Sequence, residues 1–206
     1  LVDNDDAKLL LSLNGDTNTM SGKVILLLKH AKTKVEQTGV WAGVSFGSNT
    51  MNGADYVTVV YSKDATNKMQ STVIDGWCEK NDPTRTVKYD SMFVTPNDLS
   101  LNNVLLKNFT ISEISVDGFL TKIEADFTKD LSKLDAYDWP EAKTWQTNKG
   151  YVIGSWGWVG SNGYPIQHSF TPVAHKLEDG ISLDQNFSKF LNYSLGLICL
   201  ILTFLA

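Results

Sequence analysis

Two short apolar segments decide the fold of this chain: Val40-Trp-Ala-Gly-Val-Ser-Phe46 and Tyr56-Val-Thr-Val-Val-Tyr61. Both are rich in β-branched and aromatic residues, and both are too short for helices. The residues between them, 47–55, are mostly small or polar, and they include Gly47 and Gly53, which permit backbone angles that other residues avoid. This stretch therefore predicts two strands joined by a loop.

The loop presents one soft side chain, Met51. A thioether on a polar loop between two strands has two interpretations from the residues alone. The side chain either folds back to fill a gap in the core or stays available to bind a ligand.

Similar strand-like segments, separated by turn signals, continue on both sides of this stretch. Alternation of apolar and polar residues around Asp117-Gly118 is typical of a β-hairpin. Residues 31–39 are polar and predict a connection rather than a core element. The pattern as a whole predicts an all-β, immunoglobulin-like antiparallel sandwich of about ten strands. The other predicted strands cover residues 8–13, 22–30, 71–78, 87–92, 104–112 and 151–159.

Composition excludes some classes of function. The chain has 206 residues, enough for one domain with a sizeable core. Its 18 basic and 23 acidic residues give a net charge of −5, and the basic residues form no cluster, so nucleic-acid binding is not expected. The sequence contains neither a phosphate-binding loop nor His-Glu-x-x-His, and its acidic residues form no obvious catalytic pair. The residues alone therefore do not favour an enzyme.

The chain divides into a main domain over residues 6–184, a polar spacer over 185–194 and an uncharged apolar tail over 195–206. The tail is shorter than the ~20 residues that a membrane-spanning helix needs. A short terminal apolar run behind a polar spacer is typical of a signal for a GPI lipid anchor, with Asn186 or Ser188 as the attachment residue. A true transmembrane anchor is the alternative.

The chain starts at Leu1 rather than at Met, which either a cleaved signal peptide or a shortened chain would explain. Asn-x-Ser/Thr triplets begin at Asn108, Asn186 and Asn192 and favour secretion. With the tail, they predict a lipid-anchored location on the cell surface or another extracytoplasmic membrane face.

Two motifs resemble the DOMON domain family. The first is Trp41-Ala-Gly-Val-Ser-Phe-Gly47 followed by Met51-Asn-Gly-Ala-Asp-Tyr-Val57. The second, which is less specific, is Val152-Ile-Gly-Ser-Trp-Gly157, then Pro165-Ile-Gln-His168, then Gly180-Ile-Ser-Leu183. The likeness covers roughly residues 6–183.

The resemblance implies a cofactor. Haem-binding DOMON domains are similar in using a Met after the Trp strand and a His after the last Trp-Gly strand, which are Met51 and His168 here. An imidazole and a thioether form the axial pair of many electron-transfer haems. His175 competes with His168, although Pro165 fits the family pattern for His168. The expected lining of a haem b site, named from closeness in sequence to the two ligands, is Phe46, Trp77, Trp158, Tyr164 and Phe170.

The resemblance thus implies a domain that transfers electrons through haem b, with a redox protein or a small reductant as its partner. The alternative is a haem-free DOMON-like module that binds a carbohydrate or a protein at the cell surface.

Overall fold

A computed structural model describes most of the main domain. The residues described are 1–64, 66–78, 87–89, 103–134, 138–140, 142–144, 150–161, 163, 165–166 and 174–176. Several residues named above lie outside this part of the chain: Tyr164, His168, Phe170, Asn186, Ser188 and Asn192, together with the apolar tail.

One sheet has five strands in the order β1-β2-β3-β9-β8, and all its pairings are antiparallel. Its longest pairing joins β8 to β9 through a turn at Asp117 and Gly118, whose φ angles of 51° and 82° suit a two-residue hairpin turn. The predicted hairpin is therefore confirmed. The strands are β1 (Val2–Asp3), β2 (Ala7–Gly15), β3 (Thr19–Leu28), β8 (Val104–Val116) and β9 (Phe119–Asp130).

The other sheet has six strands in the order β11-β10-β4-β5-β6-β7, also antiparallel throughout. The stretch that opened the analysis forms its central pair, β4 and β5, with the predicted loop between them. The strands are β4 (Val40–Phe46), β5 (Asp55–Lys63), β6 (Met69–Cys78), β7 (Val87–Tyr89), β10 (Tyr151–Trp158) and β11 (Ala174–Lys176).

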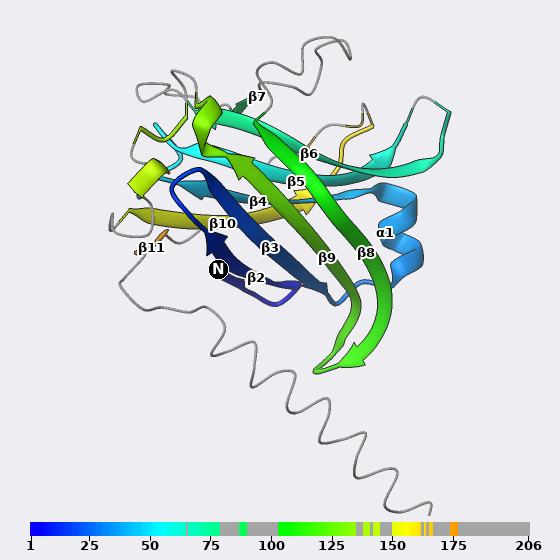
Figure 1. Cartoon of the computed structure of the whole chain (residues 1–206). Helices are drawn as coiled ribbons and strands as arrows, with labels where there is room; N and C mark the ends of the chain where they lie inside the picture. The colour runs from blue at the N-terminus through cyan, green and yellow to red at the C-terminus, as the bar shows by residue number, and fades with distance from the viewer. Residues whose placement is uncertain are drawn as a thin grey trace, which may run out of the picture.

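The two sheets pack face to face, and the strands of one run across those of the other (Figure 1). Alternate residues of each strand meet between the sheets. In β9, for example, Ile123, Ala125 and Phe127 are buried in the main core while their neighbours are more exposed. The main core cluster contains side chains from both sheets, such as Leu26 and Val44. The predicted all-β antiparallel sandwich is confirmed.

The connection at residues 31–39 is helical, which the sequence pattern did not predict. Helix α1 (Lys32–Thr38) buries Val35, and its Lys32 Nζ lies 3.6 Å from Glu36 Oε1, one turn on. Gly39, with a φ of 79°, ends the helix. Two 3-10 turns, Leu131–Lys133 and Ala142–Thr144, follow β9. Among the described residues, the helical segments are all too short or too polar to cross a membrane.

Gly47 and Gly118 provide a matched test of the loop that carries Met51. Both have positive φ, 86° and 82°, but a Cβ on Gly47 would lie 2.5 Å from Trp139 Cδ1, whereas a Cβ on Gly118 would meet nothing within 4 Å. Gly118→Ala should cost about 1–2 kcal/mol of unfolding free energy from backbone strain alone. Gly47→Ala should cost roughly 1–3 kcal/mol more, because the indole ring must move. Equal losses in urea denaturation would show that Trp139 does not pack on Gly47.

Candidate functional site

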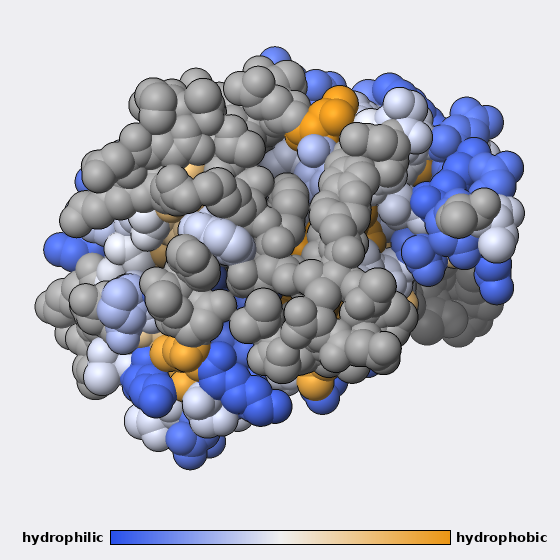
Figure 2. Space-filling model, turned by 90° about the horizontal axis from the view of Figure 1, so that it is seen from above, coloured by the Kyte–Doolittle hydropathy of each residue, from blue (hydrophilic) through white to orange (hydrophobic). Residues whose placement is uncertain are grey.

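The outer face of the six-stranded sheet is unusual because it is buried. In β4, Val40, Ala42, Val44 and Phe46 join the core between the sheets, so strand alternation places the residues between them on the outer face. Seen from above, the described part of the surface carries hydrophobic residues only in small separate patches (Figure 2). The buried outward-facing residues of β4, β5 and β10 include Trp41, Ser45, Tyr56, Thr58, Val60, Ile153 and Ser155.

The middle of this face consists of small residues, which we call the small-residue floor: Gly43, Ser45, Thr58 and Ser155. Gly43 pairs with Thr58 on one side and with Ser155 on the other. A Cβ on Gly43 would lie 3.3 Å from Thr58 Oγ1, 3.3 Å from Trp41 Cζ3 and 3.5 Å from Ser155 Oγ. Two hydroxyl groups and the edge of the Trp41 ring therefore border the space above Gly43.

Ser45 carries a buried hydroxyl that makes no hydrogen bond within the part of the chain that the structure describes. Ser45 is only 1% exposed. Leaving a buried polar group without a partner costs about 1–3 kcal/mol. A polar atom of a ligand above the floor would remove this cost.

Ser45 also lies in a sequence, Gly43-Val-Ser-Phe-Gly47, that matches the Gly-x-Ser-x-Gly pattern of serine hydrolases. In those enzymes the serine occupies a sharp turn between a strand and a helix. Here Ser45 lies inside strand β4, and its backbone pairs with β5 on one side and with β10 on the other. The structural context of a nucleophile is therefore missing at Ser45.

Two apolar groups border the floor. At one end Trp41 packs with Val60, Ile74 and Val159, and its indole Nε1 donates a hydrogen bond of 3.0 Å to the carbonyl of Ile166. At the other end lie Ala54, Tyr56 and Cys78, with Met51 packed against them. Trp41 and Ser45 are four residues apart in β4, so their Cα atoms are about 13 Å apart along the strand.

Met51 is held in place by its loop. The Tyr56 hydroxyl donates to the Met51 carbonyl at 3.2 Å, and the Gly53 amide donates to the Cys78 carbonyl at 2.8 Å. Gly47 and Gly53 have the positive φ angles, 86° and 72°, that the loop requires, as the sequence predicted. The Met51 side chain is half-buried. It packs on the outer face of the sheet, not in the main core, and part of it stays exposed.

The other predicted site residues do not gather around Met51. Phe46 is 1% exposed in the main core, and Trp158 packs against the same core, with its ring centroid 5.0 Å from that of His30. Trp77 pairs with Asp55, so it belongs to the inner face of β6. Alternation therefore turns these three residues away from the floor. His175 lies on β11, exposed, with Nε2 3.3 Å from the Leu1 carbonyl oxygen.

Sequence reasoning missed Trp41, Tyr56 and the small-residue floor as site residues. A signal was available in the strand pattern. Gly43 and Ser45 in β4, and Ser155 and Gly157 in β10, place small residues at every second position of two central strands. The outer face of a buried sheet usually carries large apolar residues, so a run of small ones indicates that a bulky group lies against it. Here the Trp41 ring is one such group: a Cβ on Gly157 would lie 2.7 Å from its Nε1, and a Cβ on Gly43 would lie 3.3 Å from its Cζ3.

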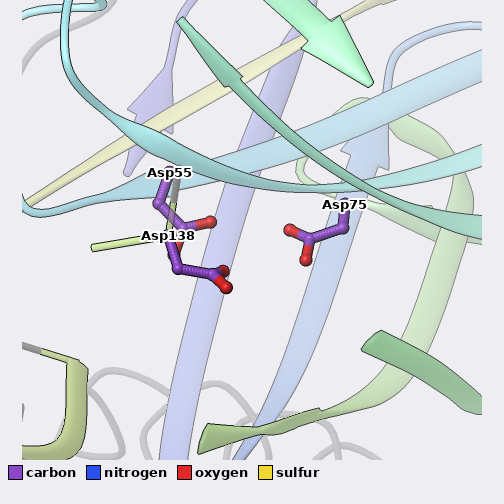
Figure 3. Close-up of side chains that lie close together, drawn as sticks. All are labelled: Asp55, Asp75 and Asp138. Carbon is purple, nitrogen blue, oxygen red and sulfur yellow. The ribbon is translucent and has the colours of Figure 1, made fainter. Parts of the chain in front are cut away.

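A second group missed by sequence reasoning lies between the sheets. The Lys129 ammonium is surrounded by three carboxylates, from Asp55, Asp75 and Asp138, which Figure 3 shows close together. Lys129 Nζ lies 2.8 Å from Asp55, 3.0 Å from Asp75 and 2.5 Å from Asp138. All four side chains are at most 4% exposed. We call these four residues the Lys129 ion cluster.

Neighbouring groups complete the hydrogen bonds of the Lys129 ion cluster. The Asn103 amide nitrogen donates to both carboxylate oxygens of Asp138, at 3.1 and 3.3 Å. The backbone N–H of Trp139 donates to Asp55 at 3.1 Å. Three carboxylates this close to one another could hold a metal ion. However, the ammonium already occupies the position where a cation would bind, so the cluster supplies its own cation.

The charges in the cluster do not balance if every group is ionised. Burial lowers the pKa of Lys129, but the three carboxylates raise it by more, so its pKa lies above the ordinary value and it stays charged. Burial raises the pKa of Asp55 and, more strongly, that of Asp75, although the Lys129 ammonium opposes the rise. One ammonium cannot neutralise three carboxylates in a dry core, so Asp55 and Asp75 hold their protons to a higher pH in the folded state than in the unfolded chain.

No protein family model, no curated protein and no solved structure matches this chain.

Replacing Lys129 by Met should destabilise the domain strongly. Removing one partner of a buried ion group leaves uncompensated charge and typically costs about 3–5 kcal/mol. Lys122→Met is the matched control, because Lys122 lies on the same strand but is partly exposed beside Glu124, and exposed ion pairs are worth about 0–1 kcal/mol. Urea denaturation of both variants measures the difference. If Lys129→Met and Lys122→Met lost similarly small amounts of unfolding free energy, the cluster would not stabilise the fold.

Stability should depend on pH through Asp75. The pKa of Asp75 is raised in the folded state, so its bound proton stabilises the fold. This contribution to the free energy of unfolding is fully present below the ordinary pKa of Asp, about 3.9, and is lost as the pH rises through the raised pKa. Asp75→Asn should therefore flatten the fall in unfolding free energy above about pH 4. Lys129 does not change the pH dependence of the unfolding free energy in this range, because it is protonated in both the folded and the unfolded state.

Asp64 is the control for Asp75, because its pKa is shifted in the opposite direction. Hydrogen bonds from the Thr66 hydroxyl and from backbone amides lower the pKa of Asp64, so its contribution is lost as pH falls through the lowered value. Asp64→Asn should change the slope only at the acid end. An unchanged slope above about pH 4 in Asp75→Asn would contradict the proton retention inferred for the cluster.

Proposed function

We propose that this domain is a DOMON-type module that binds haem b and transfers electrons, with Met51 and His168 as the axial ligands. One observation carries the proposal. Met51 lies at one end of the small-residue floor, and Ile166, two residues before His168 in the sequence, contacts Trp41 at the other end. Met51 and Ile166 thus both contact residues of the same outer face, which supports the proposal.

The residues around the floor suit a flat, largely apolar cofactor. The edge of the Trp41 ring lies beside Gly43, and Tyr56 packs at the opposite end of the floor, so aromatic rings are available to contact such a cofactor. Met51 is a half-buried residue, and its thioether could serve as an axial ligand. The hydroxyl of Ser45 provides a polar contact that the described residues leave open. His168 would supply the stronger, imidazole ligand.

This ligand pair decides the kind of chemistry. A thioether and an imidazole favour the reduced iron and raise its potential. With both axial positions filled by the protein, no position is left for oxygen or a substrate. The module would therefore pass electrons to a redox protein or a small reductant, and the tail at residues 195–206 would attach it to the outer side of a membrane.

A haem-free module remains the second candidate because of one observation. Hydroxyl groups from Ser45, Thr58 and Ser155 beside the ring of Trp41 also suit a carbohydrate, which is bound by hydrogen bonds and by stacking on aromatic rings. In that case Met51 serves only to pack against Tyr56 and Cys78.

An absorption spectrum distinguishes the two candidates. Protein expressed with haem available should show a Soret band and a change between oxidised and reduced forms. His168→Ala should lose most of the haem, whereas Met51→His should keep it at a lower potential, because a second imidazole favours oxidised iron more than sulfur does. His175→Ala is the control and should keep the wild-type spectrum. A wild-type protein without a Soret band would contradict haem binding and leave the haem-free module.

A further inference from the structure

The five-stranded sheet ends in strand β8, which carries the triplet Asn108-Phe109-Thr110. Asn108 and Thr110 are exposed, while Phe109 between them turns inward and stacks on Tyr61 with ring centroids 5.1 Å apart. The inward contact of Phe109 fixes which way its two neighbours point. Of the three Asn-x-Ser/Thr triplets in the sequence, this one lies within the described residues.

The backbone around Asn108 is irregular. The pairing with β9 shifts register between Leu106 and Asn108, so Lys107 is an extra residue in β8. Such bulges are frequent at the edges of sheets, where they disturb pairing with another chain. The Asn108 amide nitrogen lies 3.5 Å from Asp126 Oδ2, at the limit of a hydrogen bond. One amide hydrogen is enough for that contact, so the other is free for substitution.

Strand β8 is the outermost strand of the five-stranded sheet in the described part of the chain. The strand is 13 residues long, and in the described part of the sheet it pairs with β9 on one side only. Leu105, close to Asn108, is 55% exposed. A long exposed edge with an apolar residue can pair with an identical edge of a second molecule.

We propose that Asn108 carries an N-linked glycan and that this glycan prevents the β8 edge from pairing with a second copy of the chain. The modification rests on the extracytoplasmic location that is part of the proposed function. In the reaction, Asn108 Nδ2 forms a bond to the anomeric carbon of an oligosaccharide carried on a lipid pyrophosphate. The bond from that carbon to the pyrophosphate oxygen breaks, and Nδ2 loses one proton. The product is bulky and hydrophilic, and the exposed position accommodates it without disturbing the core.

Mapping of the modified residue tests the proposal directly. The full chain is directed into the secretory pathway of a eukaryotic cell, and a glycosidase that converts glycosylated asparagine to aspartate is applied in heavy-oxygen water. Most copies of the peptide that contains Asn108 should carry the heavy-oxygen label at that position. Thr110→Ser keeps the acceptor triplet and should keep the label, whereas Thr110→Ala should lose it. Unmodified Asn108 in the wild-type peptide would overturn the proposal.

The shielding role has a separate readout. Thr110→Ala should form dimers or larger species in gel filtration, while wild type and Thr110→Ser stay monomeric. A monomeric Thr110→Ala protein would overturn the shielding role.

The haem spectrum reports on the other proposal independently, because Thr110 lies in the five-stranded sheet and Met51 packs on the six-stranded one. A missing Soret band in a protein whose Asn108 peptide is labelled contradicts haem binding alone. A Soret band in a protein with unmodified Asn108 contradicts the glycan alone.

Discussion

The Lys129 ion cluster is the interaction on which the rest of the domain depends. It joins β9 of the five-stranded sheet to β5 and β6 of the six-stranded sheet, and it also holds Asp138 from the segment between β9 and β10. Hydrophobic contacts between two sheets tolerate sliding, but an ammonium within 3.0 Å of three carboxylates does not, because each displaced charge would be buried without a partner. The cluster therefore fixes how the sheets sit on each other.

The same cluster connects the core to the loop that carries Met51. Asp55 is the first residue of β5, and its neighbours Ala54 and Tyr56 face outward beside Met51. The Trp139 amide donates to Asp55, and the Trp139 ring packs over Gly47 at the other end of the same loop. Both ends of the loop are thus tied to buried groups, which leaves the half-buried Met51 side chain on a rigid support.

The two faces of the six-stranded sheet carry different residues. The inner face carries large apolar side chains and the carboxylates of Asp55 and Asp75. The outer face carries the small-residue floor, with the Trp41 ring beside Gly43. Residues on both faces are buried, so burial alone does not show to which face a residue belongs, whereas strand alternation does.

The sequence by itself determined the sandwich, the β4–β5 pair, the hairpin at Asp117-Gly118 and the loop around Met51. These features depend on local patterns: alternation, short β-branched runs and glycine at positive φ. Only the tertiary structure decided that Phe46, Trp77 and Trp158 face away from the floor, because a shift of one residue in register exchanges the faces of a strand. It alone also brought Asp55, Asp75 and Asp138 to Lys129. A lysine at an inward position of β9 indicates that carboxylates must be near, but which ones are near depends on the registers of strands far apart in the sequence.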